Sequence, residues 1–145
     1  MNPLINPDRI AGAIAPTEAV VRLLDAGVSP ERLTMSTDGN ASVPRVLPGG
    51  DVERFSFQLG LLTAVRDVVD AGVLPLADAV ALVTANPARA LRLDDAGGLA
   101  VGRRADIVCV DERLEVRTVL SAGRIVVRDG RALSPSAFQD PRWGR

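Results

Sequence analysis

Apolar residues recur every three to four positions in three stretches of the first two thirds of the chain, which predicts amphipathic helices. The first begins at Pro16, because proline suits the first helical position, and ends at Gly27. The second spans about residues 53–71, the third follows Pro75, and a short helix over residues 88–91 follows Asn86 as its N-cap. The expected apolar faces are Val20, Val21 and Leu24, then Phe57, Leu61, Val65 and Val68, then Leu76, Val80 and Val83.

A short β-prone segment, residues 33–36, lies between the first two helices and predicts a buried strand. Helix, turn and strand follow one another in this way in α/β proteins with parallel strands. Residues 37–52 are rich in Gly, Pro and small polar residues, and they predict a long loop directly after that strand. One strand cannot form a parallel sheet, so this part of the chain indicates a piece of a larger fold.

After Gly97-Gly98 the period of the apolar positions changes from helical to that of strands. Residues 107–110, 116–120 and 125–127 predict three strands of a small meander. Asp129-Gly130 is a tight-turn signal before a last short strand. The chain therefore divides into a helix-rich part over residues 1–93, a β-meander over residues 94–133 and a peripheral tail over residues 134–145.

The composition excludes several classes of chemistry. A net charge of −1 over 145 residues offers no broad field for nucleic acid or an anionic membrane. All 17 cationic residues are Arg, and the chain contains no Lys, His or Tyr. A Ser-His-Asp triad, a Cys-His dyad and a histidine-based metal site are therefore impossible within it. Cys109 alone cannot form an internal disulfide and no apolar stretch is long enough to span a bilayer, so we expect a cytoplasmic protein.

Asp38 is the first candidate for chemistry. It follows the expected strand, and ligands and catalytic groups gather at this end of strands in barrel and doubly wound folds. A carboxylate there can bind a metal or accept a proton. The alternative is that Asp38-Gly39-Asn40 forms a turn, which is the commoner origin of this composition.

The other polar candidates favour structural roles. Asp106 and Asp129 each stand next to a predicted strand or turn, where their side chains can accept hydrogen bonds from backbone amides. Arg103 and Arg104 can form an anion site, but a solvated pair is the commoner arrangement. Cys109 lies in an apolar strand, so we expect a small buried hydrophobe rather than a reactive thiol.

Four segments, in this order over most of residues 16–133, resemble the C-terminal part of metal-dependent amidohydrolases. They are Met35-Ser36-Thr37-Asp38-Gly39, Thr84-Ala85-Asn86-Pro87-Ala88, residues 102–108 and residues 121–130. Within that superfamily, residues 36–42 resemble the isoaspartyl dipeptidase (β-aspartyl peptidase) pattern Asp-Gly-Asn-Gly-Ser, with Ala41 in place of the second glycine.

The resemblance implies an α/β fold in which this chain is the C-terminal fragment of a TIM-barrel amidohydrolase. Residues 1–93 would hold the last barrel strand and helices, and residues 94–133 a portion of the small, composite β-domain. It also implies a binuclear zinc centre whose shared hydroxide attacks the β-linked amide of an isoaspartyl dipeptide. Asp38 would bind one metal and carry the proton from the hydroxide to the leaving amine, and Ser42 would help to hold the substrate carboxylate.

The family's remaining metal ligands are mostly histidines, with a bridging lysine carboxylate, and lie upstream. This chain has neither residue type, and one aspartate is too few for zinc, which takes about four ligands. We therefore expect the chain alone to bind no zinc pair and to hydrolyse nothing. Either it is a fragment, or a complementary chain supplies the histidines.

Two further hypotheses stay open. The later three segments are shared with dihydroorotase-, deacetylase- and deaminase-like amidohydrolases, and only the spacing from Asp38 to Ser42 favours dipeptides. Alternatively the chain is a non-catalytic remnant that acts as a binding module, which an apolar face left exposed would favour. The expected partners are a small dipeptide and a complementary chain, with neither nucleic acid nor membrane, and a homo-oligomer is left open.

Overall fold

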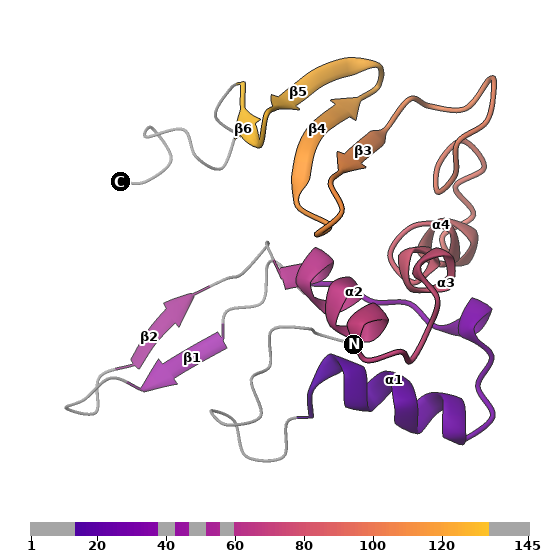
Figure 1. Ribbon diagram of the computed structural model, residues 1–145, viewed down its shortest axis with the longest axis vertical. Helices are drawn as coiled ribbons and strands as arrows, with labels where there is room; N and C mark the ends of the chain where they lie inside the picture. Colours follow the sequence, from indigo (N-terminus) through magenta and orange to yellow (C-terminus); the bar gives the residue numbers. More distant parts are fainter. Residues whose placement is uncertain (1–13, 38–42, 47–51, 56–59, 134–145) are drawn as a thin grey trace. The chain divides into compact units, whose positions relative to one another are not determined.

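The computed structural model describes residues 14–37, 43–46, 52–55 and 60–133 (Figure 1). The chain divides into two compact units, Met1–Leu93 and Asp94–Arg145. The helices are α1 (Pro16–Asp25), α2 (Gly60–Asp70), α3 (Leu76–Ala81) and α4 (Ala85–Ala90), with a 3₁₀ turn at Pro30–Arg32. The strands are β1 (Val43–Val46), β2 (Val52–Phe55), β3 (Ile107–Val110), β4 (Val116–Ser121), β5 (Arg124–Arg128) and β6 (Arg131–Ala132).

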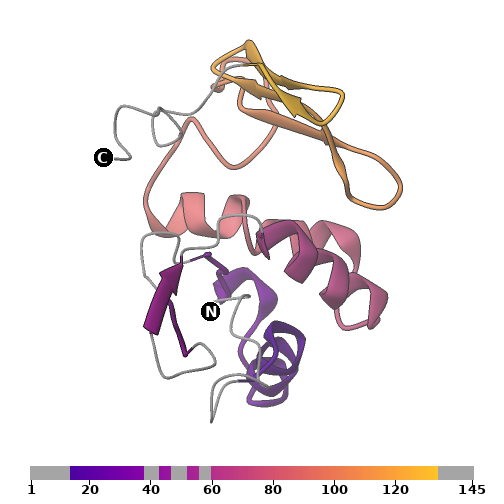
Figure 2. The same ribbon diagram turned by 90° about the vertical axis from the view of Figure 1, so that its left-hand side faces the viewer.

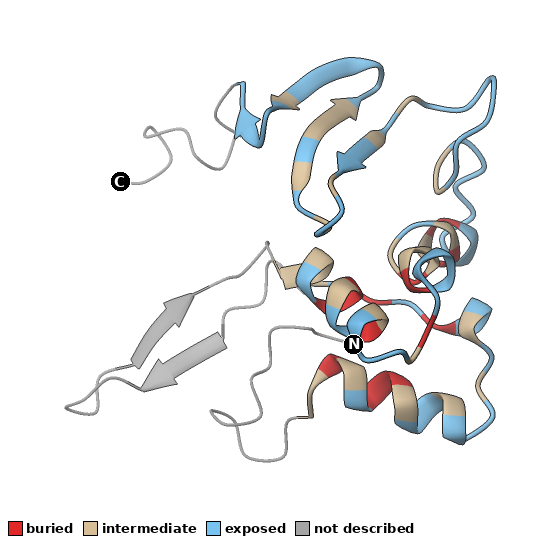
Figure 3. Cartoon of the chain, in the orientation of Figure 1, coloured by how far each residue is buried: buried red, intermediate tan, exposed pale blue. Residues whose placement is uncertain are grey.

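The core of the first unit lies where α1, α2 and the region of α3 pack together. Val20 of α1, Val65 and Val68 of α2, and Leu82 just after α3 have no exposed surface, and the buried residues of Figure 3 lie in this unit. Removing such apolar surface from water is the main favourable contribution to folding. The buried faces expected for α1 and α2 are therefore confirmed at these valines.

The ends of α1 follow the sequence prediction, but the start of α2 does not. Helix α1 begins at Pro16, and Gly27 just beyond it has φ +81°, a conformation that favours glycine. Helix α2 begins at Gly60, because residues 52–55 form strand β2, which pairs antiparallel with β1. The prediction of an uninterrupted loop over residues 37–52 and a helix from about residue 53 was therefore wrong.

The sequence carries a signal for this hairpin that the helical interpretation overrode. Residues 43–46 and 52–55 each begin with valine and end with a residue that favours strands, and the segment between them contains Pro48, Gly49 and Gly50. Two short runs of this kind, separated by a few residues that include glycine, are typical of a hairpin. Phe57, which was expected on the apolar face of the helix, lies outside the described residues.

Residues 33–36 are extended and partly buried, but they form no strand. Leu33 and Met35 are 6% and 3% exposed, whereas Thr34 and Ser36 are exposed, so the inward residues alternate as in a strand. The Met35 N–H donates to the Leu82 carbonyl at 2.9 Å, and no strand among the described residues pairs with this segment. The predicted burial is confirmed, and the predicted strand is wrong because a parallel ladder requires a neighbouring strand.

The buried face of α3 and the first residue of α4 also differ from the prediction. Pro75 is the N-cap of α3 and the six-residue helix buries Ala79, with Leu82 beyond its end, whereas Leu76 is 47% exposed. Helix α4 starts at Ala85, so Asn86 lies inside it and does not cap it, contrary to the prediction. The proline that follows is tolerated because the first amides of a helix have no intrahelical acceptor.

The second unit is an antiparallel meander with strand order β3-β4-β5-β6, as predicted (Figure 2). Its two hairpin turns hold Ala122 and Gly123 at φ +47° and +78°, and Asp129 and Gly130 at φ +51° and +74°. A two-residue turn with positive φ angles at both residues has a twist that matches the twist of the two strands it joins. The Asp129-Gly130 signal in the sequence therefore found the correct turn.

Neither face of this sheet is fully buried. None of residues 94–133 is buried, and strands β3 to β6 carry no buried colour in Figure 3. A row of directly opposed residues, Val108, Val119, Val127 and Ala132, crosses all four strands, and Val108 is 54% exposed. Cys109 is exposed too, so the prediction of a buried cysteine was wrong, because no described element of its unit covers the sheet.

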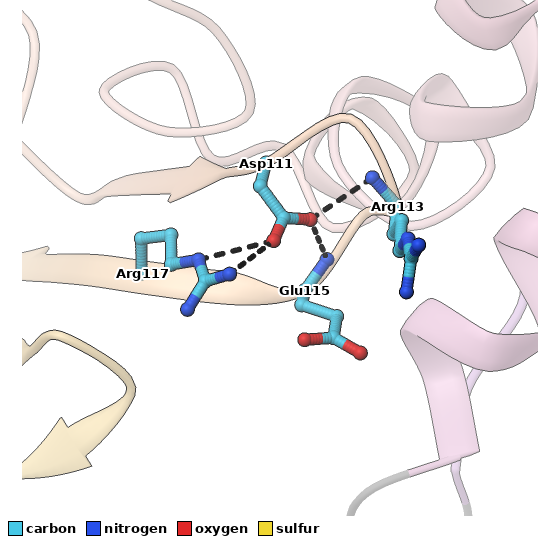
Figure 4. Close-up of polar contacts among 4 residues, drawn as sticks. All are labelled: Asp111, Arg113, Glu115 and Arg117. Carbon is cyan, nitrogen blue, oxygen red and sulfur yellow. Dashed lines mark hydrogen bonds and ion pairs between the residues drawn. The ribbon is translucent and has the colours of Figure 1, made fainter.

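The carboxylate of Asp111 accepts four hydrogen bonds in and beside the connection between β3 and β4 (Figure 4). Asp111 Oδ1 accepts hydrogen bonds from the backbone N–H groups of Arg113 and Glu115, both at 2.9 Å. Its Oδ2 accepts from Arg117 Nε at 3.0 Å and from Arg117 Nη2 at 2.6 Å. All four donors favour the ionised form of the carboxyl group.

The pKa of Asp111 is accordingly lowered from its ordinary value of 3.8, first by the Glu115 N–H and then by Arg113 and Arg117. A carboxyl group whose pKa is lower in the folded than in the unfolded state stabilises the folded state. This stabilisation is complete at pH values above the unfolded-state pKa. The stabilisation is lost as the pH falls below 3.8 through the lowered value.

None of the helices within residues 14–37 and 60–133 combines the length and the hydropathy needed to cross a bilayer.

Asp111→Asn should destabilise the sheet at neutral pH and flatten its acid dependence, because asparagine keeps an acceptor for the amides but loses the charge that holds Arg117. Thermal unfolding followed by the infrared amide I band of the strands, at pH values above and below 3.8, measures both effects. Asp129→Asn is the matched control, since asparagine also tolerates the positive φ at that turn. Identical melting curves for Asp111→Asn and the unchanged protein would contradict the assigned role.

Leu82→Ala should lower the free energy of unfolding of the helical unit by about 2–5 kcal/mol, because it empties a fully buried site. Leu76→Ala removes the same atoms from a side chain that is 47% exposed, and should cost about 0.5 kcal/mol or less. Urea unfolding followed by helical circular dichroism distinguishes the two. Equal losses for both variants would show that the assigned burial of α3 is incorrect.

Candidate functional site

The structure describes the segment that leads to the predicted site, and not the site residues themselves. Asp38 and Ser42 lie outside the described residues. Residues 30–37, which precede them, pass from the 3₁₀ turn through the buried Leu33 and Met35 to the half-buried Thr37. The elements that hold this segment are therefore the described structure next to Asp38 in the sequence.

Asn86 of α4 makes the main contacts to this segment. Its Nδ2 donates to the carbonyl oxygens of Pro30 and Leu33, both at 2.8 Å. Its Oδ1 accepts from Arg89 Nη2 at 3.0 Å. Asn86 is 4% exposed and is the one buried polar residue among those that the structure describes. Its amide is fully used, since both Nδ2 hydrogens and the oxygen have partners.

Arg89 and Leu82 extend these contacts along the same segment. Arg89 also donates to the carbonyl oxygen of Glu31, and the Met35 N–H donates to the Leu82 carbonyl at 2.9 Å. The backbone of residues 30–35 is thus bonded at four positions to α4 and the end of α3. Sequence reasoning missed this role, because Asn86-Pro87 is also a typical helix start. The available signal was the position of Asn86 inside one of the four segments of the resemblance.

Asp106 is a structural residue, as expected. Its Oδ1 accepts from the Ala122 N–H at 2.7 Å, and its Oδ2 lies 2.5 Å from Arg104 Nε. The Ala122 N–H and then the Arg104 charge lower the pKa of Asp106. Arg103 donates to the Ala96 carbonyl at 3.3 Å. The carboxylate and the two arginines therefore connect parts of one unit to one another, and they form no common site.

The residues present do not fit a metal centre. The chain has no histidine, its single cysteine is exposed on β3, and no group of three His, Cys, Asp or Glu side chains converges anywhere in the described part of the chain. A catalytic zinc site takes at least three protein ligands. Asp38 alone cannot supply them, so the chemistry derived below uses only the chain's own groups.

Several curated proteins are similar to this chain. An adenine deaminase of Methanothrix thermoacetophila is 43% identical over 67 residues, which are 46% of this chain and 12% of that protein. A 5'-deoxyadenosine deaminase of Methanothermobacter thermautotrophicus is 33% identical over 143 residues, which cover 84% of this chain and 30% of that protein. The chain thus spans less than a third of the length of these relatives.

Solved structures give a second set of similarities. The β-aspartyl dipeptidase of Fervidobacterium islandicum AW-1, in complex with a β-Asp-Leu dipeptide, matches with a TM-score of 0.67 and 28% identity. That match covers 83% of this chain and 32% of the dipeptidase chain. The N-acetyl-D-glucosamine-6-phosphate deacetylase of Mycobacterium smegmatis matches with a TM-score of 0.52 and 32% identity, over 79% of this chain and 35% of that one.

These similarities confirm the expected fold class and the superfamily. The chain is an α/β amidohydrolase fragment that corresponds to one part of a TIM-barrel enzyme. Proteins of this kind are hydrolases that generally use a divalent metal. The profile of the amidohydrolase family matches residues 13–126, which is more than half of the sequence, and the chain therefore belongs to the amidohydrolase family.

Proposed function

We propose that this chain is the C-terminal part of a hydrolase that cleaves the β-aspartyl amide bond of dipeptides. The observation that carries the proposal is the pattern of residues 36–42, which resembles that of isoaspartyl dipeptidases, at the end of a segment anchored by α4. The likeness to the β-aspartyl dipeptidase of F. islandicum supports it, since the match covers most of this chain.

In this proposal Asp38 is the acid and base. Its carboxylate accepts a proton from the attacking water and then donates it to the nitrogen of the departing amine as the C–N bond breaks. The Ser42 hydroxyl donates a hydrogen bond to the free carboxylate of the dipeptide. A carboxylate works best as a base when it is held in one place. The preceding segment, residues 30–35, is bonded to α4 and to the end of α3.

The family's metal is zinc in this proposal, and all of its ligands except Asp38 come from outside these 145 residues. They belong either to a preceding part of the same polypeptide or to a complementary chain. The strands of the second unit fit a chain that is completed by further structure, because a sheet in which no described residue is buried removes little apolar area from water.

A purine deaminase is the second candidate function. The proteins named adenine deaminase are more similar in sequence over the region they match, at 43% identity for that of M. thermoacetophila. An aminopurine has no carboxylate for Ser42 to bind, so the two candidates differ in their use of this residue.

The chain alone should bind no zinc pair and show no hydrolysis of β-Asp-Leu. Isothermal calorimetry with zinc measures the first and release of leucine the second. The control is the same titration with Asp38→Asn, because any residual weak binding that does not use Asp38 will be unchanged in it. Stoichiometric sub-micromolar binding that Asp38→Asn abolishes would contradict the expectation that the ligands lie elsewhere.

Fusion of the part of the F. islandicum dipeptidase that this chain does not cover to residues 13–145 tests the activity directly. Zinc-loaded fusion protein should hydrolyse β-Asp-Leu and leave adenine unchanged. Asp38→Asn should lower kcat by about 10²–10⁴-fold, since it removes the proton carrier. Ser42→Ala should chiefly raise KM, because it removes a contact to the substrate.

Asp129→Asn in the same fusion is the matched control, since it changes one carboxylate in a sheet turn. Deamination of adenine without dipeptide hydrolysis would favour the second candidate. A folded, metal-loaded fusion with neither activity would favour a non-catalytic remnant. Full dipeptidase activity in Asp38→Asn would exclude the assigned acid and base.

A further inference from the structure

We propose that Asp129 is a site at which this chain forms isoaspartate spontaneously, at a rate set by the opening of the β5–β6 hairpin. This modification is independent of the proposed function. Among the residues that the structure describes, Asp129 is the one aspartate followed by a glycine. Glycine has no side chain to hinder the approach of its backbone nitrogen to the preceding carboxyl group. Both residues are exposed, and they form the two-residue turn between β5 and β6.

The reaction joins two neighbouring groups of the chain. The Gly130 nitrogen forms a bond to Cγ of the protonated Asp129 side chain, and the carboxyl OH leaves with the amide hydrogen as water. Water then opens the resulting succinimide ring at either of its carbonyl carbons. Opening at Cγ restores aspartate, whereas opening at the backbone carbonyl carbon leaves a β-linked chain of unchanged composition. Water is therefore the only co-reactant that the modification needs.

The closed hairpin hinders this attack. The Gly130 N–H donates to the Arg117 carbonyl at 3.0 Å, which engages the nitrogen that has to react. A β-carbon at Gly130 would lie 3.3 Å from the Val116 carbonyl oxygen, so the backbone of β4 lies close beside the turn. The amide must therefore leave the Arg117 carbonyl before the ring can close, and the reaction requires the hairpin to open.

Several features of the hairpin favour that opening. Strand β6 is a two-residue strand at the edge of the sheet. Arg128 and Arg131 are directly opposed in its ladder, and like charges in opposed positions destabilise a pair of strands. None of residues 124–133 is buried, so the separation of β6 exposes little additional apolar area. Local openings of this kind cost less free energy than global unfolding.

Two other aspartates of the same unit lack these properties. Asp106 and Asp111 are followed by isoleucine and glutamate, whose side chains crowd the amide nitrogen that would have to attack. Their carboxylates also accept hydrogen bonds from backbone amides, whereas no described residue bonds the Asp129 carboxylate. The structure therefore favours the reaction at Asp129 over both of them.

A β-linkage at Asp129 changes the sheet as well as the turn. It lengthens the turn by one backbone carbon, and the register of β5 on β6 depends on a turn of two residues. The Leu133 N–H, which donates to the Val126 carbonyl at 2.9 Å, then loses its acceptor. We therefore expect β6 to separate from β5 in the modified chain.

Incubation of the full chain in heavy-oxygen water at neutral pH tests the proposal. Each ring opening takes its oxygen from water, so the peptide that contains Asp129 should gain heavy oxygen, and peptides with Asp106 or Asp111 should not. Electron-transfer fragmentation in the mass spectrometer distinguishes the β-linked peptide from the ordinary one. In urea that unfolds the chain, uptake at Asp129 should be about tenfold faster or more, because the turn no longer holds the Gly130 N–H. Hydrogen exchange at Leu133 should rise as the β-linked form accumulates.

Asp129→Gly is the matched control, since glycine keeps the positive φ of the turn and removes the carboxyl group. It should gain no heavy oxygen at the turn and should keep the Leu133 amide protected. An unlabelled Asp129 in the folded chain, after a time in which the urea-unfolded chain has reacted, would overturn the assigned site. Uptake without a β-linked product, or equal uptake at Asp106 and Asp111, would overturn the assigned reaction. Equal rates in the folded and unfolded chain would overturn its control by the hairpin.

Discussion

The buried side-chain amide of Asn86, which links α4 to the distant segment of residues 30–33, is the constraint on which the helical unit depends. Asn86 satisfies the carbonyl oxygens of Pro30 and Leu33 in a site with almost no access to water. A backbone carbonyl without a partner in such a site is costly, so these bonds make the path of residues 30–35 obligatory once the helices have packed. The apolar core supplies most of the stabilisation, and the amide selects one path for the connecting chain.

Different interactions stabilise each of the two units. The helical unit has a small, fully buried core formed by Val20, Val65, Val68 and Leu82. In the sheet none of residues 94–133 is buried, and local features determine its form: two turns with positive φ angles and the bonds around Asp111. Each of these features acts over only a few residues, so it sets the local path of the chain without a core.

The family model assigns the chain to the amidohydrolase family, whereas the substrate depends on side chains at the site. The relatives include deaminases of purines, and the similar structures include a dipeptidase and deacetylases. One fold can carry all of these activities, since function resides in a few residues placed on a common scaffold. In the proposed function, Asp38 and Ser42 are the residues whose chemistry would distinguish the candidates.

The sequence by itself determined the local features of this protein. Pro16 and Gly27 marked the ends of α1, Asp129-Gly130 marked a hairpin turn, and strands β3 to β5 followed from runs of apolar residues, because each signal acts within a few positions. The ordered motifs also indicated the family, which the profile match confirmed. Only the tertiary structure decided the partners of distant groups. It placed Asn86 against residues 30–33, gave residues 33–36 no strand partner among the described residues and exposed Cys109, since burial and pairing depend on what packs beside a segment.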